Sequence, residues 1–215
     1  MEIRAQRAGV NGAHGPLLLP TSLTAKPGEL TLVAGEPGTG HTALGLLLSG
    51  RMKPSTGTVS PDAKTLRKQV VLIDAPEVNE PEEALSLAAV VGEELAMNGM
   101  PSGKKAVHDW LVEHAADEHA AKRFEHVPAQ TRCAVMLELA SARPGVTALV
   151  LDCPDRYHPN PREWFALAHN YVTPERSVVA LCSNSSAHIL LSANILDIPH
   201  ARLGEDNDTK MEITA

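Results

Sequence analysis

Residues 35–42 read Gly35-Glu36-Pro37-Gly38-Thr39-Gly40-His41-Thr42, and they indicate the architecture of this chain more clearly than any other segment. The segment matches the phosphate-binding pattern G-x-x-x-x-G-K-[ST] at every position except the lysine, which is His41. In such a loop the backbone N–H groups surround phosphate oxygens, the hydroxyl binds magnesium, and the lysine contacts the β- and γ-phosphates. An ammonium group is charged at neutral pH, whereas a free imidazole, with a pKa of about 6.5, is mostly neutral. The segment therefore keeps a phosphate cradle and weakens its strongest positive charge.

The elements on either side of this loop are those that a phosphate-binding loop requires. Residues 29–34 are an apolar run, which predicts a short buried strand leading directly into the loop. A helix is expected to begin near Thr42, and its residues are apolar nearly all round, as in a helix packed between other elements. Strand, loop and helix in this order predict that phosphate would be bound by Gly35, Gly38, Thr39, Gly40, His41 and Thr42.

Strand candidates alternate with helical stretches along the rest of the chain. This alternation indicates an α/β sandwich, and the continuous apolar runs are typical of parallel strands. The predicted elements are strands over 69–74, 146–152 and 177–183, helices over 130–142 and 161–169, and a hairpin over 195–203.

The region between the second and third predicted strands is helical in pattern. One helix is expected from Pro81, a second over 104–114 and a third over 116–124, separated by glycine and proline residues. Together with the helix over 130–142, they predict a small helical subdomain of about residues 76–142.

Length and composition restrict the classes of protein that fit. The 215 residues are enough for one large domain, with or without an inserted subdomain. A net charge of −7 and the absence of a basic tract in the sequence disfavour nucleic-acid binding. The sequence contains no run of 18 apolar residues, so no membrane span is predicted. The first residues lack the apolar stretch of a signal peptide. Three widely spaced cysteines predict reduced thiols in the cytosol.

Several further segments follow one another in a recognisable order. Pro27-Gly28-Glu29 precedes the loop, and residues 47–59 read Leu-Leu-Ser-Gly-Arg-Met-Lys-Pro-Ser-Thr-Gly-Thr-Val. Later, Ala140-Ser141-Ala142-Arg143-Pro144 leads into residues 148–154, Ala-Leu-Val-Leu-Asp-Cys-Pro. In residue identity and spacing these segments resemble the ATP-binding cassette of ABC transporters, over about residues 1–203. The resemblance implies a P-loop NTPase sandwich of ABC-cassette type with a small inserted helical subdomain, and residues 204–215 are then expected to form a flexible polar tail.

The resemblance also assigns roles at the end of the strand over 146–152. In the family this strand ends in Asp-Glu-Pro, where the aspartate organises magnesium and the glutamate polarises the attacking water. Asp152 keeps the first position, so Thr42 and Asp152 would hold magnesium if nucleotide binds. Cys153 takes the glutamate position, and a thiol is not an equivalent base for activating water.

Other functional positions of the family are altered as well. The signature Leu-Ser-Gly-Gly-Gln falls on residues 126–130, His-Val-Pro-Ala-Gln, where only the glutamine is kept. The switch histidine falls on Ser183 or Asn184, and the Q-loop glutamine falls on Asp74 or Ala75. Residues 10–14 contain no aromatic side chain that could stack on adenine, although His14 could stack weakly. So many simultaneous changes indicate a degenerate cassette.

The resemblance and these changes together imply a degenerate ABC-type ATP-binding subunit of a membrane transporter-like complex, with weak or no ATP hydrolysis. Such a subunit would lie in the cytoplasm on the face of the membrane and bind a membrane-embedded subunit and a second cassette, as a homodimer or heterodimer. ATP and magnesium would bind weakly or not at all. Two alternatives stay open: an active or conditionally active transport ATPase that uses His41 in place of the lysine, and a non-transport scaffold or regulator that binds a protein partner.

Overall fold

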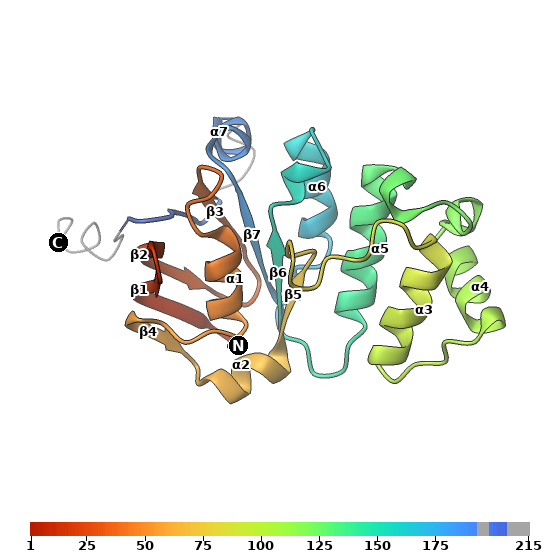
Figure 1. Cartoon of the computed structure of the whole chain (residues 1–215), viewed down its shortest axis with the longest axis horizontal. Coiled ribbons are helices and arrows are strands. Elements are labelled where there is room, and N and C mark those ends of the chain that lie inside the picture. The colour runs from red at the N-terminus through yellow and green to blue at the C-terminus, as the bar shows by residue number, and fades with distance from the viewer. Residues whose placement is uncertain (193–197, 206–215) are drawn as a thin grey trace.

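The centre of the molecule is a five-stranded parallel sheet, seen in a computed structural model that describes residues 1–192 and 198–205 (Figure 1). The strands follow the order β5-β6-β7-β3-β8 and every neighbouring pair is parallel. Their carboxyl ends therefore meet at one edge of the sheet. The strands are β5 (Val70–Ile73), β6 (Ala148–Asp152), β7 (Ser177–Ser183), β3 (Leu30–Gly35) and β8 (His200–Arg202).

A second sheet, antiparallel and three-stranded, lies at one end of the molecule. It consists of β2 (Gly15–Ala25), β1 (Ile3–Gly12) and β4 (Thr56–Ser60), in that order. Helix α1 (His41–Leu48) lies between this sheet and the parallel sheet (Figure 1). Buried side chains of β1, β2 and α1 pack together against one face of the parallel sheet and form the first core.

Both faces of the parallel sheet are buried, which explains why its strands are continuous apolar runs. Consecutive side chains of a strand point to opposite faces. Val33 accordingly packs in the first core with α1, whereas its neighbour Leu32 packs in a second core formed with the helices of the other face. Val150 and Leu149 on β6 divide between the two cores in the same way.

Helices α3 (Leu87–Met97) and α4 (Lys104–Glu113) form the end of the molecule farthest from the antiparallel sheet, and α5 (Ala129–Ser141) lies between them and the parallel sheet (Figure 1). Helix α3 begins where the Ser86 hydroxyl accepts a hydrogen bond from the N–H of Ala89. The helices belong to the second core, which extends without a break into the sheet. The fold is thus an α/β sandwich with a small helical subdomain inserted between β5 and β6.

The remaining helices connect the strands. Asn160 caps α6 (Pro161–His169), which has proline at its first position, and Asp62 caps α2 (Ala63–Gln69). Helix α7 (Asn184–Ser192), which follows β7 directly, was not among the predicted elements. Three short 3-10 helices complete the set, η1 (Asp117–His119), η2 (Phe124–His126) and η3 (Pro154–Arg156).

Two helical predictions were wrong in detail. The helix expected from Pro81 begins only at Leu87, because the Ser86 side chain supplies the cap, and residues 82–85 form turns. The helix expected over 116–124 is replaced by turns and the two 3-10 helices η1 and η2. A hydrogen bond from the N–H of Phe124 to the carbonyl of Leu85 draws this segment against the start of α3 instead.

The end of the described chain also differs from expectation. The hairpin expected over 195–203 falls partly on residues 193–197, which lie outside the described residues. Its described part, β8, pairs in parallel with β3. The predicted tail, 204–215, is described only through Glu205, and there it is bonded to β2, through Gly204 to Thr21 and through the Glu205 carbonyl to Ser22.

Two sequence expectations concern chemistry and membranes rather than architecture. All three cysteines are unpaired, as predicted. Within residues 1–192 and 198–205, no helix has both the length and the apolar character needed to cross a lipid bilayer.

Candidate functional site

A groove of about 950 Å³ opens at the carboxyl edge of the parallel sheet. The segments that follow β3, β5, β6 and β7 all contribute to it, as the parallel topology requires. It brings together residues that are far apart in the sequence: Gly38, Gly40, His41 and Thr42 from the loop, Asp152 and Cys153 after β6, and Ser183 at the end of β7. Of the predicted site residues, Gly35, Thr39 and Asn184 do not line the groove but lie directly beside it in the chain.

The loop has the backbone conformation that its glycines allow. Gly38 and Gly40 have positive φ angles of 81° and 112°, which L side chains rarely adopt. A Cβ atom on Gly40 would also lie 2.4 Å from the carbonyl oxygen of Leu17, so β2 packs directly against the loop. The first N–H groups of α1 have no acceptor within the helix and face the loop region, which makes them available to an anion.

His41 lines the groove, but its Nε2 is directed into the protein. Its side chain is only 6% exposed, and its Nε2 lies 3.0 Å from the carbonyl oxygen of Cys182 on β7. A carbonyl only accepts hydrogen bonds, so Nε2 must carry the proton. In the neutral imidazole Nδ1 is then without a proton and cannot donate to a phosphate. The replacement of lysine by His41 thus removes a positive charge. The one N–H donor of the neutral ring is used in the hydrogen bond to the carbonyl of Cys182 on β7.

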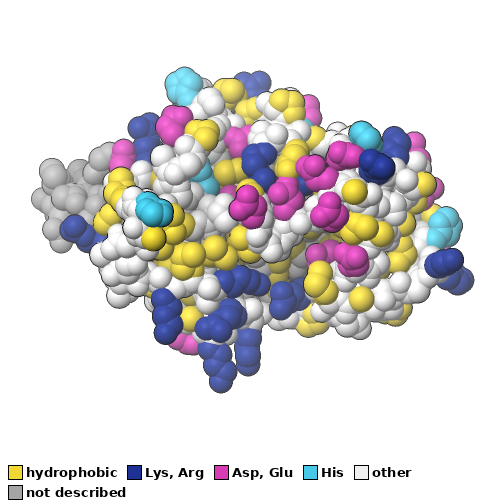
Figure 2. All heavy atoms as spheres, in the orientation of Figure 1, with side chains coloured by type: hydrophobic (Ala, Val, Ile, Leu, Met, Phe, Trp, Pro, Cys, Tyr) yellow, Lys and Arg dark blue, Asp and Glu magenta, His cyan; other side chains and the backbone are white. Residues whose placement is uncertain are grey.

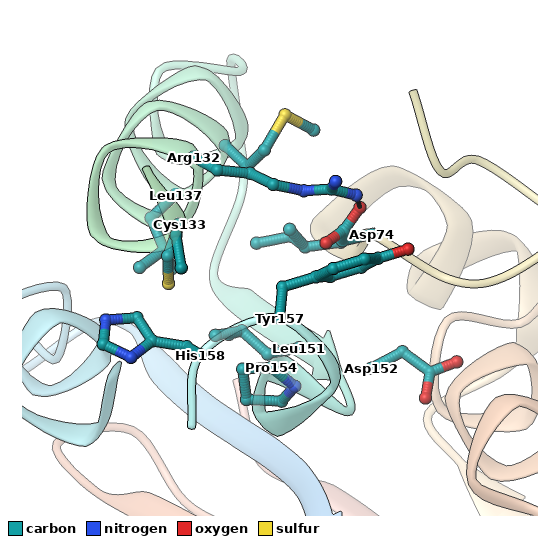
Figure 3. Close-up of a pocket in the computed structure, with 12 residues that line it drawn as sticks. Asp74, Arg132, Cys133, Leu137, Leu151, Asp152, Pro154, Tyr157 and His158 are labelled. Carbon is teal, nitrogen blue, oxygen red and sulfur yellow. Dashed lines mark hydrogen bonds and ion pairs between the residues drawn. The ribbon is translucent and has the colours of Figure 1, made fainter. Parts of the chain in front are cut away.

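Asp152 is a buried carboxylate without a nitrogen or oxygen donor among the described residues. It is 1% exposed, and the thiol of the adjacent Cys153, a weak donor, is the group that interacts with it. Figure 3 shows its side chain directed away from Tyr157 and His158. A buried carboxylate normally has donors or a cation, and carboxylate and hydroxyl oxygens are the ligands that magnesium prefers. Asp152 and Thr42, which line the same groove, therefore fit a magnesium ion.

Cys153 cannot take over the role of a base. It has a left-handed backbone conformation, with φ of 51°, at the turn from β6 into η3. Burial first, and then the charge of the adjacent Asp152, raise the pKa of its thiol far above the ordinary value. The group is therefore a protonated thiol at neutral pH and has no capacity to accept a proton from water.

The switch position is occupied by serine and asparagine, and both are engaged. Ser183 donates to Asp155 through its N–H at 2.9 Å and its hydroxyl at 2.6 Å, and Ser186 donates to the same oxygen at 2.7 Å. Asn184 donates to Glu36 in the loop at 2.6 Å. These contacts hold the start of α7 to the turn after β6 and to the loop.

On the other side of β6 four charged residues and a tyrosine form a group that we call the ion-pair cluster: Asp74, Glu80, Arg132, Arg156 and Tyr157. Figure 3 shows three of them, Asp74, Arg132 and Tyr157. The guanidinium of Arg132 lies between the rings of Phe124 and Tyr157, with its central carbon 4.4 and 3.7 Å from their centroids. It donates to Asp74 at 3.0 Å and to Glu80 at 3.4 Å. Burial raises the pKa of Asp74, and the charge of Arg132 opposes this effect. The cluster ties the Q-loop position to α5 and η3.

A small cavity of about 30 Å³ lies beside the ion-pair cluster, where Cys133 and His158 point toward each other (Figure 3). Burial, and secondarily the charge of Asp74, raise the pKa of Cys133 to about 12. The cavity is lined mainly by apolar side chains and is large enough for no more than a small group such as water.

The charge of the groove opposes the binding of a polyphosphate. Its charged lining consists of the carboxylates Glu77, Asp152 and Asp155 and one cation, Arg156. Arg156 is already bonded to Glu80 and to the carbonyl of Asp74. The groove thus has the form of a phosphate site without an available cation among the described residues that line it.

Several residues of the site were not found by reasoning from the sequence. Leu17 of β2 lines the groove where an aromatic residue was sought near His14, and only the pairing of β1 with β2 brings it there. Asp155, Arg156 and Ser186 had no pattern that distinguished them. The signature position, residues 126–130, lies at the start of α5 and does not contribute to the groove.

No protein-family model matches the chain, and no curated protein matches it. Solved structures do. A putative ABC transporter ATP-binding protein from Pyrococcus furiosus superimposes with a TM-score of 0.67 at 16% identity, over 94% of this chain and 98% of that one. A nucleotide-free ATP-binding cassette from an ABC transporter gives 0.65 at 14% identity, over 98% and 94%.

A further match, an ABC-transporter cassette in its ADP conformation, has a TM-score of 0.59 at 14% identity, over 85% of this chain and 82% of that one. The fold of this chain is therefore that of an ABC-type ATP-binding cassette, as the sequence resemblance implied. At these identities the likeness concerns the fold alone.

Proposed function

We propose that this chain is a degenerate ABC-type ATP-binding subunit of a membrane transporter-like complex, in which ATP hydrolysis is weak or lost. One observation carries the proposal. The phosphate cradle is present in a groove of suitable size, but the single residue that should supply its charge, His41, is hydrogen-bonded to Cys182 instead.

Residual nucleotide binding would depend on the groups that the site keeps. The N–H groups at the start of α1 would hold phosphate oxygens, and Thr42 and Asp152 would hold magnesium. Bound magnesium would supply positive charge at a groove that otherwise has too little. Arg156 adds none, because the ion-pair cluster holds it.

Hydrolysis would lack its base. Water attack on a phosphate needs a group that orients and polarises the water, and Cys153 is a protonated thiol at that position. Ser183 and Asn184 are engaged with Asp155 and Glu36, so neither is free to replace the switch histidine.

The proposal extends to the organisation and surroundings of the chain. Residues 1–203 would form the cassette, with the helical subdomain over about 76–142, and residues 204–215 a polar tail. The subunit would lie on the cytoplasmic face of a membrane and bind a membrane-embedded subunit and a second cassette, the same or different. A neighbouring gene that encodes several apolar spans of about 20 residues would support this assembly over the scaffold alternative.

The test is a calorimetric titration of ATP with magnesium against the wild type and His41→Lys. We expect weak or undetectable binding by the wild type and roughly 10- to 100-fold tighter binding by the variant, since a hydrogen bond to a charged group contributes about 1.5–3 kcal/mol.

His108→Lys, the same change on the exposed surface of α4, is the matched control and should leave the affinity unchanged. Tight binding by the wild type, with steady ATP turnover abolished by Asp152→Asn, would establish the active-ATPase alternative instead. If neither protein binds nucleotide, the scaffold or regulator alternative is favoured.

A further inference from the structure

A group of basic side chains covers the edge of the molecule opposite the phosphate loop. Residues 51–68 contain five basic residues and one acidic residue, Asp62, in a chain whose net charge is −7. Figure 2 shows Lys and Arg side chains gathered along the lower edge, where Figure 1 places α2. We call the following exposed residues the basic surface: Arg51, Lys53, Lys64, Arg67, Lys68 and Arg143.

The members of the basic surface come from three segments that hydrogen bonds hold together. Arg51, after the end of α1, donates to the carbonyl of Val70 directly after α2 at 3.4 Å, and the turn that contains Arg143 is tied to the same place by the bond from Thr147 N–H to the carbonyl of Gln69 at 2.9 Å. The charges of Arg143 and Arg67 accordingly help burial to lower the pKa of Arg51. Lys64 and Lys68 are one helical turn apart on α2. Arg143 enters from the turn after α5, which is why the sequence contains no continuous basic tract.

No carboxylate of the described residues neutralises these charges, although Arg51 donates to the carbonyls of Ser49 and Val70 and Arg67 to that of Ala63. None of the six makes an ion pair with a described residue. The Asp62 carboxylate is occupied in capping α2, through Lys64 N–H and Thr65 N–H at 2.9 and 3.1 Å. Glu94 lies near Arg143 but is partly buried, and burial raises its pKa. Six uncompensated cations on one surface favour an external polyanion.

The basic surface and the phosphate loop lie at opposite ends of α1. The loop is at the start of α1 and Arg51 just beyond its end, and the groove reaches the basic surface only at Met52, between Arg51 and Lys53. A partner of the basic surface would therefore leave the phosphate loop free.

The residues around the basic surface indicate which class of polyanion it would bind. Residues 51–68 and 142–146 contain no aromatic side chain on which the bases of a single-stranded nucleic acid could stack. Met97, 71% exposed, is at the end of α3, where the next residue, Asn98, donates to Leu139 of α5, one turn before Arg143. Clustered lysine and arginine next to an exposed apolar side chain suit a lipid surface, where headgroups are anionic and the layer beneath is apolar.

We propose that the basic surface binds the anionic lipid headgroups of a membrane directly. The six cations supply the attraction, and Met97 enters the interface. The net negative charge of the rest of the chain orients the molecule, because it keeps the opposite edge, which bears the phosphate loop, away from the same membrane.

The test uses the full chain and phospholipid vesicles without nucleotide or protein partner, so its outcome does not depend on the proposed function. We expect sedimentation with vesicles that contain phosphatidylserine and not with phosphatidylcholine alone. Binding should weaken with added salt, since the screening length falls to about 10 Å at 0.1 M. The combined substitution Lys64→Gln, Arg67→Gln and Lys68→Gln should lower binding roughly 100-fold, at about fivefold per cation.

The matched control is Lys104→Gln, Lys122→Gln and Arg162→Gln, which removes the same charge from exposed residues outside the basic surface. It should lower binding only slightly, and circular dichroism would show that both variants are folded. The proposal is overturned if the two variants behave alike, if the lipid headgroup charge makes no difference, or if the chain retains a duplex oligonucleotide while it ignores anionic vesicles.

Discussion

The two sides of the β6 terminus differ in how their charges are paired. In the ion-pair cluster every charged group has at least one partner, and the Arg132 guanidinium is held between two rings. In the groove, one turn of chain away, the buried carboxylate of Asp152 has no nitrogen or oxygen donor among the described residues. The cluster is thus complete within the chain, whereas the groove is incomplete. The difference supports the proposal that the groove binds a group from outside the chain, such as a metal ion.

The same contrast holds between two aspartates three residues apart. Asp155 accepts three hydrogen bonds from Ser183 and Ser186, while Asp152 accepts none from a nitrogen or oxygen of the described residues. If the contrast is correct, substitutions at Arg132, Asp155 and Asp152 should change the free energy of unfolding by decreasing amounts, and the last should change it with the opposite sign.

The largest effect is expected from Arg132→Met. The methionine would keep apolar contact with Phe124 and Tyr157 but leave Asp74 and Glu80 without their shared cation. Removing one partner of a buried ion pair costs about 3 kcal/mol or more. Urea denaturation followed by circular dichroism would measure the loss. Arg162→Met, an exposed arginine on α6, is the control and should change stability by less than about 0.5 kcal/mol. A similar small effect at Arg132 would mean that the cluster does not hold the fold together.

A smaller loss is expected from Asp155→Asn. The amide has the same shape but no charge, so the bonds from Ser183 and Ser186 weaken and α7 is held less firmly to the turn after β6. Hydrogen bonds to a charged group contribute about 1.5–3 kcal/mol, and we expect a loss near the lower value because an acceptor oxygen remains. Asp117→Asn, on the exposed η1, provides the comparison. If Asp155→Asn and Asp117→Asn are equally stable, the hydrogen bonds from Ser183 and Ser186 to Asp155 do not contribute to the free energy of unfolding.

Asp152→Asn should stabilise the protein by about 1 kcal/mol, because it removes an unpartnered buried charge. The same variant should lose any rise in melting temperature that magnesium gives the wild type, since binding to the folded state alone is what raises it. Scanning calorimetry with and without magnesium measures both effects. A destabilised Asp152→Asn, or a magnesium response equal to that of the wild type, would remove the distinction between cluster and groove.

Much of the architecture could be predicted because it depends on local sequence. The glycines of residues 35–42, the apolar runs of the strands and the order of the segments are sufficient to indicate a cassette-type sandwich. Errors arose where neighbours in space overruled local pattern. The start of α3 is set by Ser86, the 3-10 helices by contacts with residues 83–88, and β8 by pairing with β3.

The candidate site was predicted in part. The identities at the loop and at Asp152 and Cys153 could be inferred from spacing, since these residues follow predicted strands. Leu17 and Asp155 could not, because Leu17 enters through the pairing of β1 with β2 and Asp155 through bonds to residues 28 and 31 positions away.

The amino-acid order was enough to predict a phosphate cradle, the changed residues at His41 and Cys153, and the sandwich that presents them, because each depends on neighbours in the chain. The folded structure was needed to show where His41 directs its proton, which carboxylate is paired, and that six scattered cations share one surface. Those properties depend on contacts between segments that only folding brings together: His41 with Cys182, Asp155 with Ser183, and Arg51 with Val70.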